Sequence, residues 1–270
     1  MNRFAIRSTS IDSKLTFPGR SEMRPAQEAS DPDPASRIIV ALDVESGEEA
    51  FDIIDDCRSF GVAFKVGLQL FTNSGPAFVS RLVETGCRVF LDLKFHDIPN
   101  TVAKASVEAA RLGVWMFNLH ASGGIEMMRR SLDEVNEAVE REKLTRPNII
   151  AVTVLTSSDA DDLKEIGIET PVKDQVVRLS RMAKEAGLDG VVASARESVI
   201  IRQTIDDPFL IVAPGIRPGT GTIDDQKRVT TPVDALAAGA DPVVIGRPIT
   251  ASADRAKALE HIIDSIKRPL

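Results

Sequence analysis

Cysteine is scarce in this 270-residue chain, and so are other features typical of secreted or membrane proteins. The two cysteines, Cys57 and Cys87, form neither a metal-ligand spacing nor a disulfide framework, and we interpret both as packing residues. No apolar run is long enough to cross a membrane, and the N-terminus lacks the apolar core of a secretory signal. These absences predict a protein of the reducing cytoplasm with no membrane partner.

Positive charge is also in deficit. Lysine and arginine number 33 against 40 aspartates and glutamates, for a formal net charge of -7. This balance argues against a general nucleic-acid-binding surface, although a local basic pocket for a small anion is still compatible with it. Hydrophobic residues make up 43% of the chain and charged residues 27%, which predicts a globular protein with a sizeable core.

Residues 1–36 differ in composition from the rest of the chain, because they are rich in serine, proline, aspartate and arginine. Such a segment buries little apolar surface, so we expect a flexible, disordered N-terminal extension followed by one domain over residues 37–270. Basic residues such as Arg3 faintly suggest an organelle address. Asp12 and Glu22 weigh against it, so plain disorder is the favoured interpretation.

A regular alternation of apolar and helical segments begins after the extension. Short apolar runs, which we interpret as strands, cover residues 37–43, 62–67, 89–94, 114–120, 148–155, 189–193, 209–214 and 241–246. Helical spacing follows them at residues 45–60, 76–85, 99–112, 125–143, 174–186, 196–203, 231–238 and 254–266. Strands that alternate with helices in this way indicate parallel βα units.

The number and size of these units predict the fold class. Near-continuous hydrophobicity is typical of strands buried on both faces. Eight units in about 235 residues match a single (β/α)₈ TIM barrel. The alternative is a doubly wound open sheet, but the turn after the first strand, Leu42–Glu45, lacks the glycine-rich dinucleotide pattern of that fold.

The segment Val89–Thr101 carries a dense set of ionisable residues at a strand end. Apolar residues lead to Asp92, Lys94 follows two positions later, and Asp97 follows three after that. Residues two apart on a strand share a face, so Asp92 and Lys94 should point the same way. Burying such groups costs free energy unless they are paired. An ordinary buried ion pair is the alternative interpretation, and the nearby Asp97 makes it less satisfactory.

Polar side chains mark the ends of several other expected strands as well. They are Asp43, Lys65, Asp92, Lys94, Asn118, His120, Thr156 and Arg217. Active sites of (β/α)₈ barrels lie at these C-terminal ends, and neighbouring strands are only about 5 Å apart. Alternating charges would keep the lysines as ammonium groups, so Lys94 should act as an acid rather than as a Schiff-base amine. For His96 and His120 both structural hydrogen bonding and catalysis stay open, and we favour the structural interpretation.

Glycines and arginines in the last quarter of the chain predict a phosphate site. Pro214–Gly221 follows the seventh expected strand and Ile245–Pro248 follows the eighth, and these loops form the usual phosphate site of this fold. Glycine lets backbone N–H groups approach an anion, and arginine binds it with two N–H groups. The alternatives are a mobile turn at Gly219 and Gly221 and a surface charge at Arg247. We favour phosphate binding, with the seventh loop acting as a lid.

Together these motifs resemble the bacterial branch of the orotidine 5′-phosphate decarboxylase family. Residues 92–101 contain Asp-x-Lys-x-x-Asp followed by Ile-Pro-Asn-Thr. The other matching segments, in order, are Ala41–Asp43, Phe64–Gly67, Leu119–Gly124, Val152–Ser157, Pro214–Pro218 and Ile245–Pro248. The resemblance extends from about residue 37 to residue 268. It implies a carboxy-lyase that converts orotidine 5′-monophosphate (OMP) to UMP and CO₂, the last step of de novo pyrimidine biosynthesis, without metal or cofactor.

The resemblance also implies roles for individual residues. Lys94 would donate the proton to C6 of the pyrimidine, and Lys65, Asp92 and Asp97 would complete a charged array. The family is homodimeric with shared active sites, so Asp97 and Thr101 would reach into the partner's site. The residues implied to bind substrate are Asp43, Lys65, Asp92, Thr101, Thr156, Arg217, Gln226, Gly246 and Arg247.

Two other functions remain open at this stage. A sugar-phosphate decarboxylase or synthase of the same superfamily would need Mg²⁺ and an extra acidic ligand near the second strand. A non-catalytic barrel that senses UMP would need no buried array of charges. The presence of Lys65, Asp92, Lys94 and Asp97 together therefore favours the decarboxylase.

Overall fold

The computed structural model describes residues 33–218 and 230–267. Most of the expected extension, residues 1–32, lies outside this range, as do Gly219, Gly221 and Gln226. The described chain opens with a short 3₁₀ helix, η1 (Pro34–Arg37), where the Asp33 carboxylate accepts a hydrogen bond from the backbone N–H of Ala35. The boundary between extension and barrel stays a prediction.

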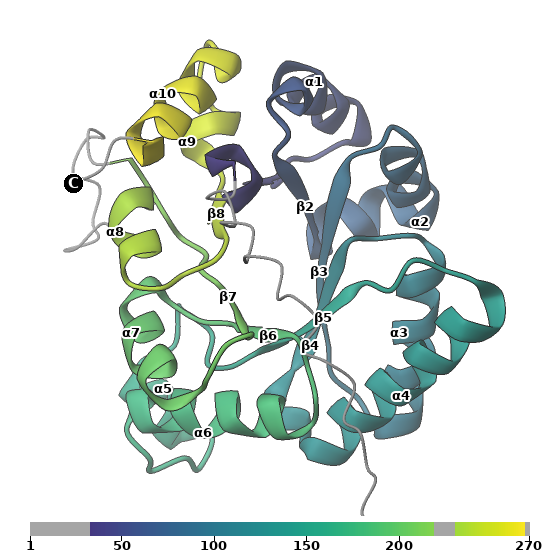
Figure 1. The fold of residues 1–270 in the computed structure, drawn as a ribbon, viewed down its shortest axis with the longest axis vertical. Helices are drawn as coiled ribbons and strands as arrows, with labels where there is room; N and C mark the ends of the chain where they lie inside the picture. The colour runs from purple at the N-terminus through teal and green to yellow at the C-terminus, as the bar shows by residue number, and fades with distance from the viewer. Residues whose placement is uncertain (1–32, 219–229, 268–270) are drawn as a thin grey trace, which may run out of the picture. The chain divides into compact units, whose positions relative to one another are not determined.

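Eight parallel strands form the centre of the described chain (Figure 1). They are β1 (Ile38–Ala41), β2 (Ala63–Gly67), β3 (Arg88–Phe95), β4 (Met116–His120), β5 (Asn148–Val152), β6 (Gly190–Val192), β7 (Leu210–Val212) and β8 (Val243–Ile245). Each strand pairs with its neighbour in sequence, and β1 also pairs with β8. A bridge between Ala213 and Val243 joins the two edges. The predicted (β/α)₈ barrel is therefore confirmed, and the doubly wound open sheet is excluded.

Helices surround the strands on the outside (Figure 1). They are α1 (Gly47–Cys57), α2 (Leu68–Glu84), α3 (Pro99–Arg111), α4 (Ile125–Glu142), α5 (Ala160–Glu165), α6 (Val172–Glu185), α7 (Ala195–Thr204), α8 (Pro232–Ala237), α9 (Arg247–Thr250) and α10 (Arg255–Lys267). The remaining 3₁₀ segments are η2 (Arg58–Phe60) and η3 (Ala121–Gly123). In the described ranges, no helix has both the length and the apolar character needed to cross a membrane.

Three helical features differ from the sequence expectation. Helix α2 begins at Leu68 rather than at residue 76, because Gly75, with φ 69°, joins two helical pieces and the expected helix was only the second of them. Helices α5 and α9 were not expected. They span six and four residues, which is too short for a clear helical periodicity.

The strands alternate between two buried layers, and this alternation positions the site. On β1, Ile38 and Val40 pack outward into the layer shared with the helices, whereas Ile39 and Ala41 face the barrel interior. The interior cluster consists of Ile39, Ala41, Ala63, Phe90, Met116, Ile150, Val212 and Val244. Successive side chains on a strand point to opposite faces. On each strand, the next residue that faces inward on the C-terminal side therefore lies between the interior cluster and the C-terminal end of the barrel.

Candidate active site

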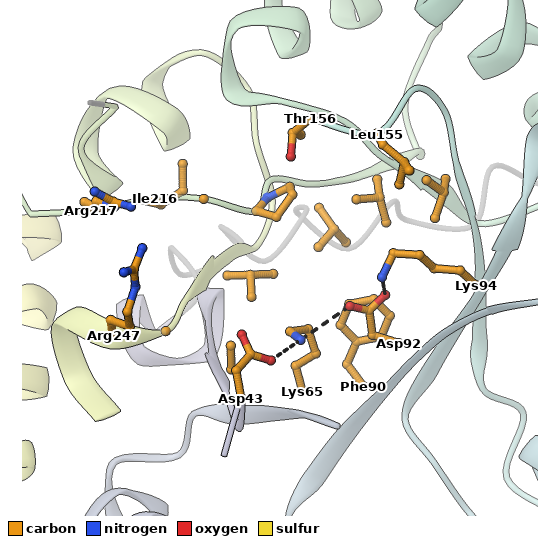
Figure 2. A pocket seen from close by; sticks show the side chains of 18 of the residues that line it. Asp43, Lys65, Phe90, Asp92, Lys94, Leu155, Thr156, Ile216, Arg217 and Arg247 are labelled. Carbon is orange, nitrogen blue, oxygen red and sulfur yellow. Dashed lines mark hydrogen bonds and ion pairs between the residues drawn. The ribbon is translucent and has the colours of Figure 1, made fainter. Parts of the chain in front are cut away.

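A pocket of about 330 Å³ opens at the C-terminal ends of the strands (Figure 2). This volume lies within the range of roughly 300–1,000 Å³ typical of small-molecule sites. Phe90, Val212 and Val244 of the interior cluster lie among the residues that line it. Its polar lining residues are Asp43, Lys65, Asp92, Lys94, Thr156, Arg217 and Arg247, with Gly246 beside them. The structure thus brings together eight of the residues that the sequence analysis assigned to the site.

Strand alternation explains how the charged residues enter the pocket. Ala41 and Phe90 face the interior, so Asp43 and Asp92, two positions further on, point the same way. In the parallel pairing of β1 with β2, Lys65 lies beside Ala41, which places its side chain between the two acids. Lys94 joins them at the end of β3.

These four side chains form a continuous chain of alternating charge. The Nζ atom of Lys65 lies 2.8 Å from Oδ1 of Asp43 and 3.4 Å from Oδ2 of Asp92. Nζ of Lys94 lies 2.7 Å from Oδ1 of Asp92. The side chains of Lys65 and Asp92 are only 11% and 13% exposed. Mutual pairing offsets the cost of withdrawing them from water.

A pair of histidines lies beside this array. The rings of His96 and His120 are 5.3 Å apart between centroids. Burial lowers the pKa of His120, and the nearby positive charges of His96 and Lys94 lower it further, whereas Asp92 acts in the opposite direction. These effects favour the uncharged imidazole at position 120.

The opposite side of the pocket carries two arginines. Arg217 follows β7 and Arg247 begins α9, and Figure 2 shows both guanidinium groups on the far side of the cavity from the Asp92–Lys94 pair. Within residues 33–218 and 230–267, neither guanidinium makes an ion pair with a carboxylate. This end of the pocket therefore suits an anionic group of a ligand. Gln226, expected at the same end, lies outside the described residues.

Thr156 lies on a third wall of the pocket. The segment after β5 supplies both Thr156 and its exposed neighbour Leu155. Figure 2 shows the threonine hydroxyl directed toward the cavity, between the arginine side and the Lys94 side. It can donate one hydrogen bond and accept others from the middle part of a bound molecule.

Asp97 and Thr101 are not among the residues that line this pocket. Asp97 is exposed, and its Oδ1 atom accepts a hydrogen bond from the backbone N–H of Ile98 at 2.6 Å. Thr101 is exposed in the first turn of α3. Ile98, between them, is a large apolar residue with 66% of its surface exposed. The structure therefore leaves both predicted site residues outside the pocket of this chain.

One polar residue beside the array was not assigned a role from the sequence. Asn118 on β4 is fully buried, and its Nδ2 group donates a hydrogen bond to Oδ1 of Asp92 at 2.7 Å. Its inward position, two residues beyond Met116 of the interior cluster, was a usable signal. Alternation alone did not reveal which charged residue it would contact.

The arrangement separates two kinds of chemistry within one cavity. At one end an ammonium group is held against a carboxylate and can stabilise and protonate a developing negative charge. At the other end two guanidinium groups can hold a phosphate. Among the residues that the structure describes, no cluster of three or more histidine, cysteine or acidic side chains is arranged as a metal site.

Comparisons with known proteins point to one family. The model of the "Orotidine 5'-phosphate decarboxylase / HUMPS family" matches residues 36–262. A protein named orotidine 5′-phosphate decarboxylase from Geobacter sulfurreducens is 55% identical over 203 residues, which cover 75% of this chain and 84% of that protein. One from Syntrophotalea carbinolica is 49% identical over 234 residues, covering 87% and 96%. The crystal structure of orotidine 5′-phosphate decarboxylase from Lactobacillus acidophilus superposes with a TM-score of 0.76 at 37% identity, covering 86% of this chain and 100% of that one.

Proposed function

The chain belongs to the orotidine 5′-phosphate decarboxylase family and converts OMP to UMP and CO₂ in pyrimidine biosynthesis, and we propose that Lys94 is the proton donor of this reaction. The proposal rests mainly on the position of Lys94 in the pocket. The Lys94 ammonium group lies 2.7 Å from the Asp92 carboxylate inside the pocket, at the end remote from Arg217 and Arg247. A nucleotide bound by its phosphate at the arginines would extend its pyrimidine toward Lys94.

The reaction breaks the bond between C6 and the carboxylate carbon. The electron pair of that bond stays on C6 while CO₂ leaves. The positively charged Lys94 stabilises this carbanion and then transfers one proton from Nζ to C6, so that UMP forms and Lys94 becomes a neutral amine. A proton from solvent restores the ammonium group. Because Lys94 is already held in place by Asp92, little reorganisation is needed when charge develops.

Asp92 has two roles in this proposal. It holds the Lys94 ammonium group, and it lies where the substrate carboxylate would enter. Repulsion between two carboxylates would favour the loss of one of them as neutral CO₂. Lys65, which pairs with both Asp92 and Asp43, keeps the remaining charges balanced. Asp43 and Lys65 would also bind the ribose hydroxyls, and Thr156 would contact the pyrimidine.

Phosphate binding is the proposed role of the opposite end of the pocket. Arg217, Gly246 and Arg247 line it, and Gln226 is expected to join them. The phosphate is remote from C6, so its binding energy can hold the nucleotide in the reactive position without touching the reacting bond. The part of the loop that carries Gln226 lies outside the described residues.

A homodimer with shared sites is the proposed assembly. Asp97 and Thr101 lie outside the pocket of their own subunit, beside the exposed apolar side chain of Ile98. These features fit a surface that covers the pocket of a second copy and supplies Asp97 to its charged array. A cytoplasmic location belongs to the same proposal.

Two substitutions at opposite ends of the pocket test the assignment. Lys94→Ala should remove nearly all decarboxylation of OMP while UMP affinity is largely retained. Arg217→Ala should weaken UMP binding, because a charged hydrogen bond contributes about 1.5–3 kcal/mol, or roughly ten- to hundredfold in affinity. Ultraviolet absorbance follows OMP loss, and calorimetry gives the affinity for UMP.

The outcomes separate the competing functions. Activity of the unmodified protein that persists in EDTA argues against a Mg²⁺-dependent sugar-phosphate enzyme, and any OMP turnover argues against a passive UMP sensor. Turnover near the wild-type level in Lys94→Ala would show that another group donates the proton. Unchanged UMP affinity in Arg217→Ala would place the phosphate elsewhere.

A further inference from the structure

Strand β3 contains a bulge at the centre of the charged array. In its pairing with β4, Leu91 lies opposite Phe117 and Phe95 lies opposite Leu119. Three residues of β3, from Asp92 to Lys94, therefore face a single residue of β4, which is Asn118. Bulges of this kind interrupt the ladder of backbone hydrogen bonds and redirect side chains, often beside active sites.

The bulge gives Lys94 an unusual backbone conformation. Its φ is 53°, in the left-handed region that residues with a Cβ atom rarely adopt. Lys143, at the C-terminal end of α4, is the other non-glycine residue with positive φ in the described ranges. A strained conformation persists only when the surrounding structure holds it. A contact that holds the Lys94 backbone is therefore needed for the position of its ammonium group.

Asn118 makes that contact. Its Oδ1 atom accepts a hydrogen bond from the backbone N–H of Lys94 at 2.8 Å, and its Nδ2 group donates to Oδ1 of Asp92 at 2.7 Å. Asn118 is 0% exposed, so water does not replace either bond. The orientation of the amide follows from its partners, because a backbone N–H only donates and a carboxylate only accepts.

We propose that Asn118 is a positioning residue for decarboxylation, and the inference rests on the proposed role of Lys94. One side chain binds the backbone of Lys94 and the carboxylate of Asp92, and Nζ of Lys94 returns to the same Oδ1 atom of Asp92. The three groups thus form a closed loop of hydrogen bonds. Asn118 is not among the residues that line the pocket, so it acts through Lys94 and Asp92 rather than on the nucleotide.

At neutral pH the amide of Asn118 satisfies both partners, whereas leucine or an ionised aspartate at this position does not. Leucine would leave the Lys94 N–H buried without an acceptor. Aspartate preserves the size and the acceptor for Lys94, but at neutral pH it places a second carboxylate against Asp92 and removes the donor. At low pH the introduced carboxyl group binds a proton, and its O–H can donate to Asp92 in place of the amide N–H.

This difference defines the test, which measures kcat, KM and UMP affinity for Asn118→Leu and Asn118→Asp. Near pH 8 both variants should lose on the order of 10²-fold in kcat, the loss expected when a reacting group is displaced by about 1 Å. UMP affinity should change less than about threefold, because the phosphate end is untouched. The kcat of Asn118→Asp relative to the unmodified protein should rise as the pH is lowered from 8 to 5. The kcat of Asn118→Asp is divided by that of the unmodified protein at each pH. Lys65, Asp92, Lys94 and His120 lie beside position 118 in both proteins, so any pH dependence that they cause cancels in this ratio.

Met116→Leu is the matched control. Met116 lies on the same strand, two positions before Asn118, in the apolar interior cluster. This change of similar volume should leave kcat unaltered, so it measures the effect of repacking β4 alone. If Asn118→Leu does not fold, Asn118→Asp, which keeps the side-chain volume, decides the question.

Distinct outcomes would overturn the inference. Undiminished kcat in both Asn118 variants of an active enzyme would defeat it while leaving the proposed function intact. A parallel loss of kcat, UMP affinity and thermal stability, with no recovery of Asn118→Asp at low pH, would show a purely structural role. An unmodified protein that does not decarboxylate OMP would overturn the proposed function and this inference together.

Discussion

Lys65 and Asp92 show how individual charged side chains are accommodated in an otherwise apolar barrel. Each is largely withdrawn from water: Lys65 contacts two carboxylates, and Asp92 contacts two ammonium groups and the amide of Asn118. At 4 Å and an effective dielectric near 20, one such pair is worth about 4 kcal/mol before the cost of desolvation. Because each keeps another partner when one is removed, the loss should be smaller than the roughly 3–5 kcal/mol typical of a buried pair that is fully broken. Variants in the array therefore need a stability measurement beside each rate.

The lowered pKa of His120 predicts how the stability of the protein depends on pH. Burial and the charges of His96 and Lys94 lower its pKa from the ordinary value of 6.5. Below pH 6.5 the unfolded chain therefore binds a proton more readily than the folded protein does, so this group reduces the free energy of unfolding as the pH falls toward the lowered value. His120→Gln should accordingly lose less stability than the unmodified protein between pH 7 and pH 5, as measured by urea unfolding.

His261→Gln provides the comparison for that experiment. His261 is exposed on α10, away from the His96–His120 pair. If both variants changed the pH dependence equally, the effect would not arise from the surroundings of His120. A steeper loss of stability in His120→Gln would contradict the direction of the pKa shift.

At the scale of elements, the close approach of β6 and β7 depends on a glycine. Gly190 pairs with Leu210, and a Cβ atom at position 190 would lie 2.6 Å from the Cβ atom of Leu210 and also overlap its backbone carbonyl. Backbone atoms in a paired strand cannot move aside as a flexible side chain can. Gly190→Ala should therefore reduce the free energy of unfolding by about 3 kcal/mol, at the upper end of typical overpacking costs.

Gly86→Ala separates steric overlap from backbone strain in that measurement. Gly86 has φ 83°, and an added Cβ atom there meets nothing within 4 Å. The left-handed conformation alone should cost about 1–2 kcal/mol. A loss in Gly190→Ala no larger than this would show that β6 and β7 can separate to accommodate the methyl group.

At the scale of the whole molecule, the proposed dimer with shared sites predicts that two inactive variants restore activity when they are mixed. If Asp97 serves the partner's site, a heterodimer of Lys94→Ala and Asp97→Ala subunits has one site with both defects and one intact site. An equal mixture with free subunit exchange should then recover about a quarter of wild-type activity, because half of the dimers are mixed and each has one working site. The measurement is OMP turnover after the two inactive proteins are mixed.

Lys94→Ala mixed with Lys65→Ala is the matched control for complementation. Both of these residues line the pocket of their own subunit, so no combination of the two chains yields an intact site. This mixture should stay inactive. Absence of recovery in the Lys94→Ala and Asp97→Ala mixture, with exchange demonstrated, would assign Asp97 to its own subunit.

The sequence alone predicted the eight strands, most of the helices and most of the residues at the pocket. Alternation along a strand is a local property, so Asp43, Asp92 and Lys94 could be assigned to one end of the barrel before their contacts were known. The identity of the family followed from the order of motifs such as Asp92–Thr101. Alternation and motifs are both visible in residues close together in the sequence, so neither requires knowledge of which side chains contact one another.

Only the tertiary structure showed how the array is held. The bulge in β3, the left-handed backbone of Lys94 and the two hydrogen bonds of Asn118 arise where β3 meets β4, between residues 24 and 26 positions apart in sequence. Regular alternation already predicted that Asp92 and Lys94 share a face. In the structure, however, the contact between Lys94 and Asp92 forms where the pairing of β3 with β4 is interrupted. A local pattern cannot reveal this break, because pairing register is decided by how two strands pack against each other.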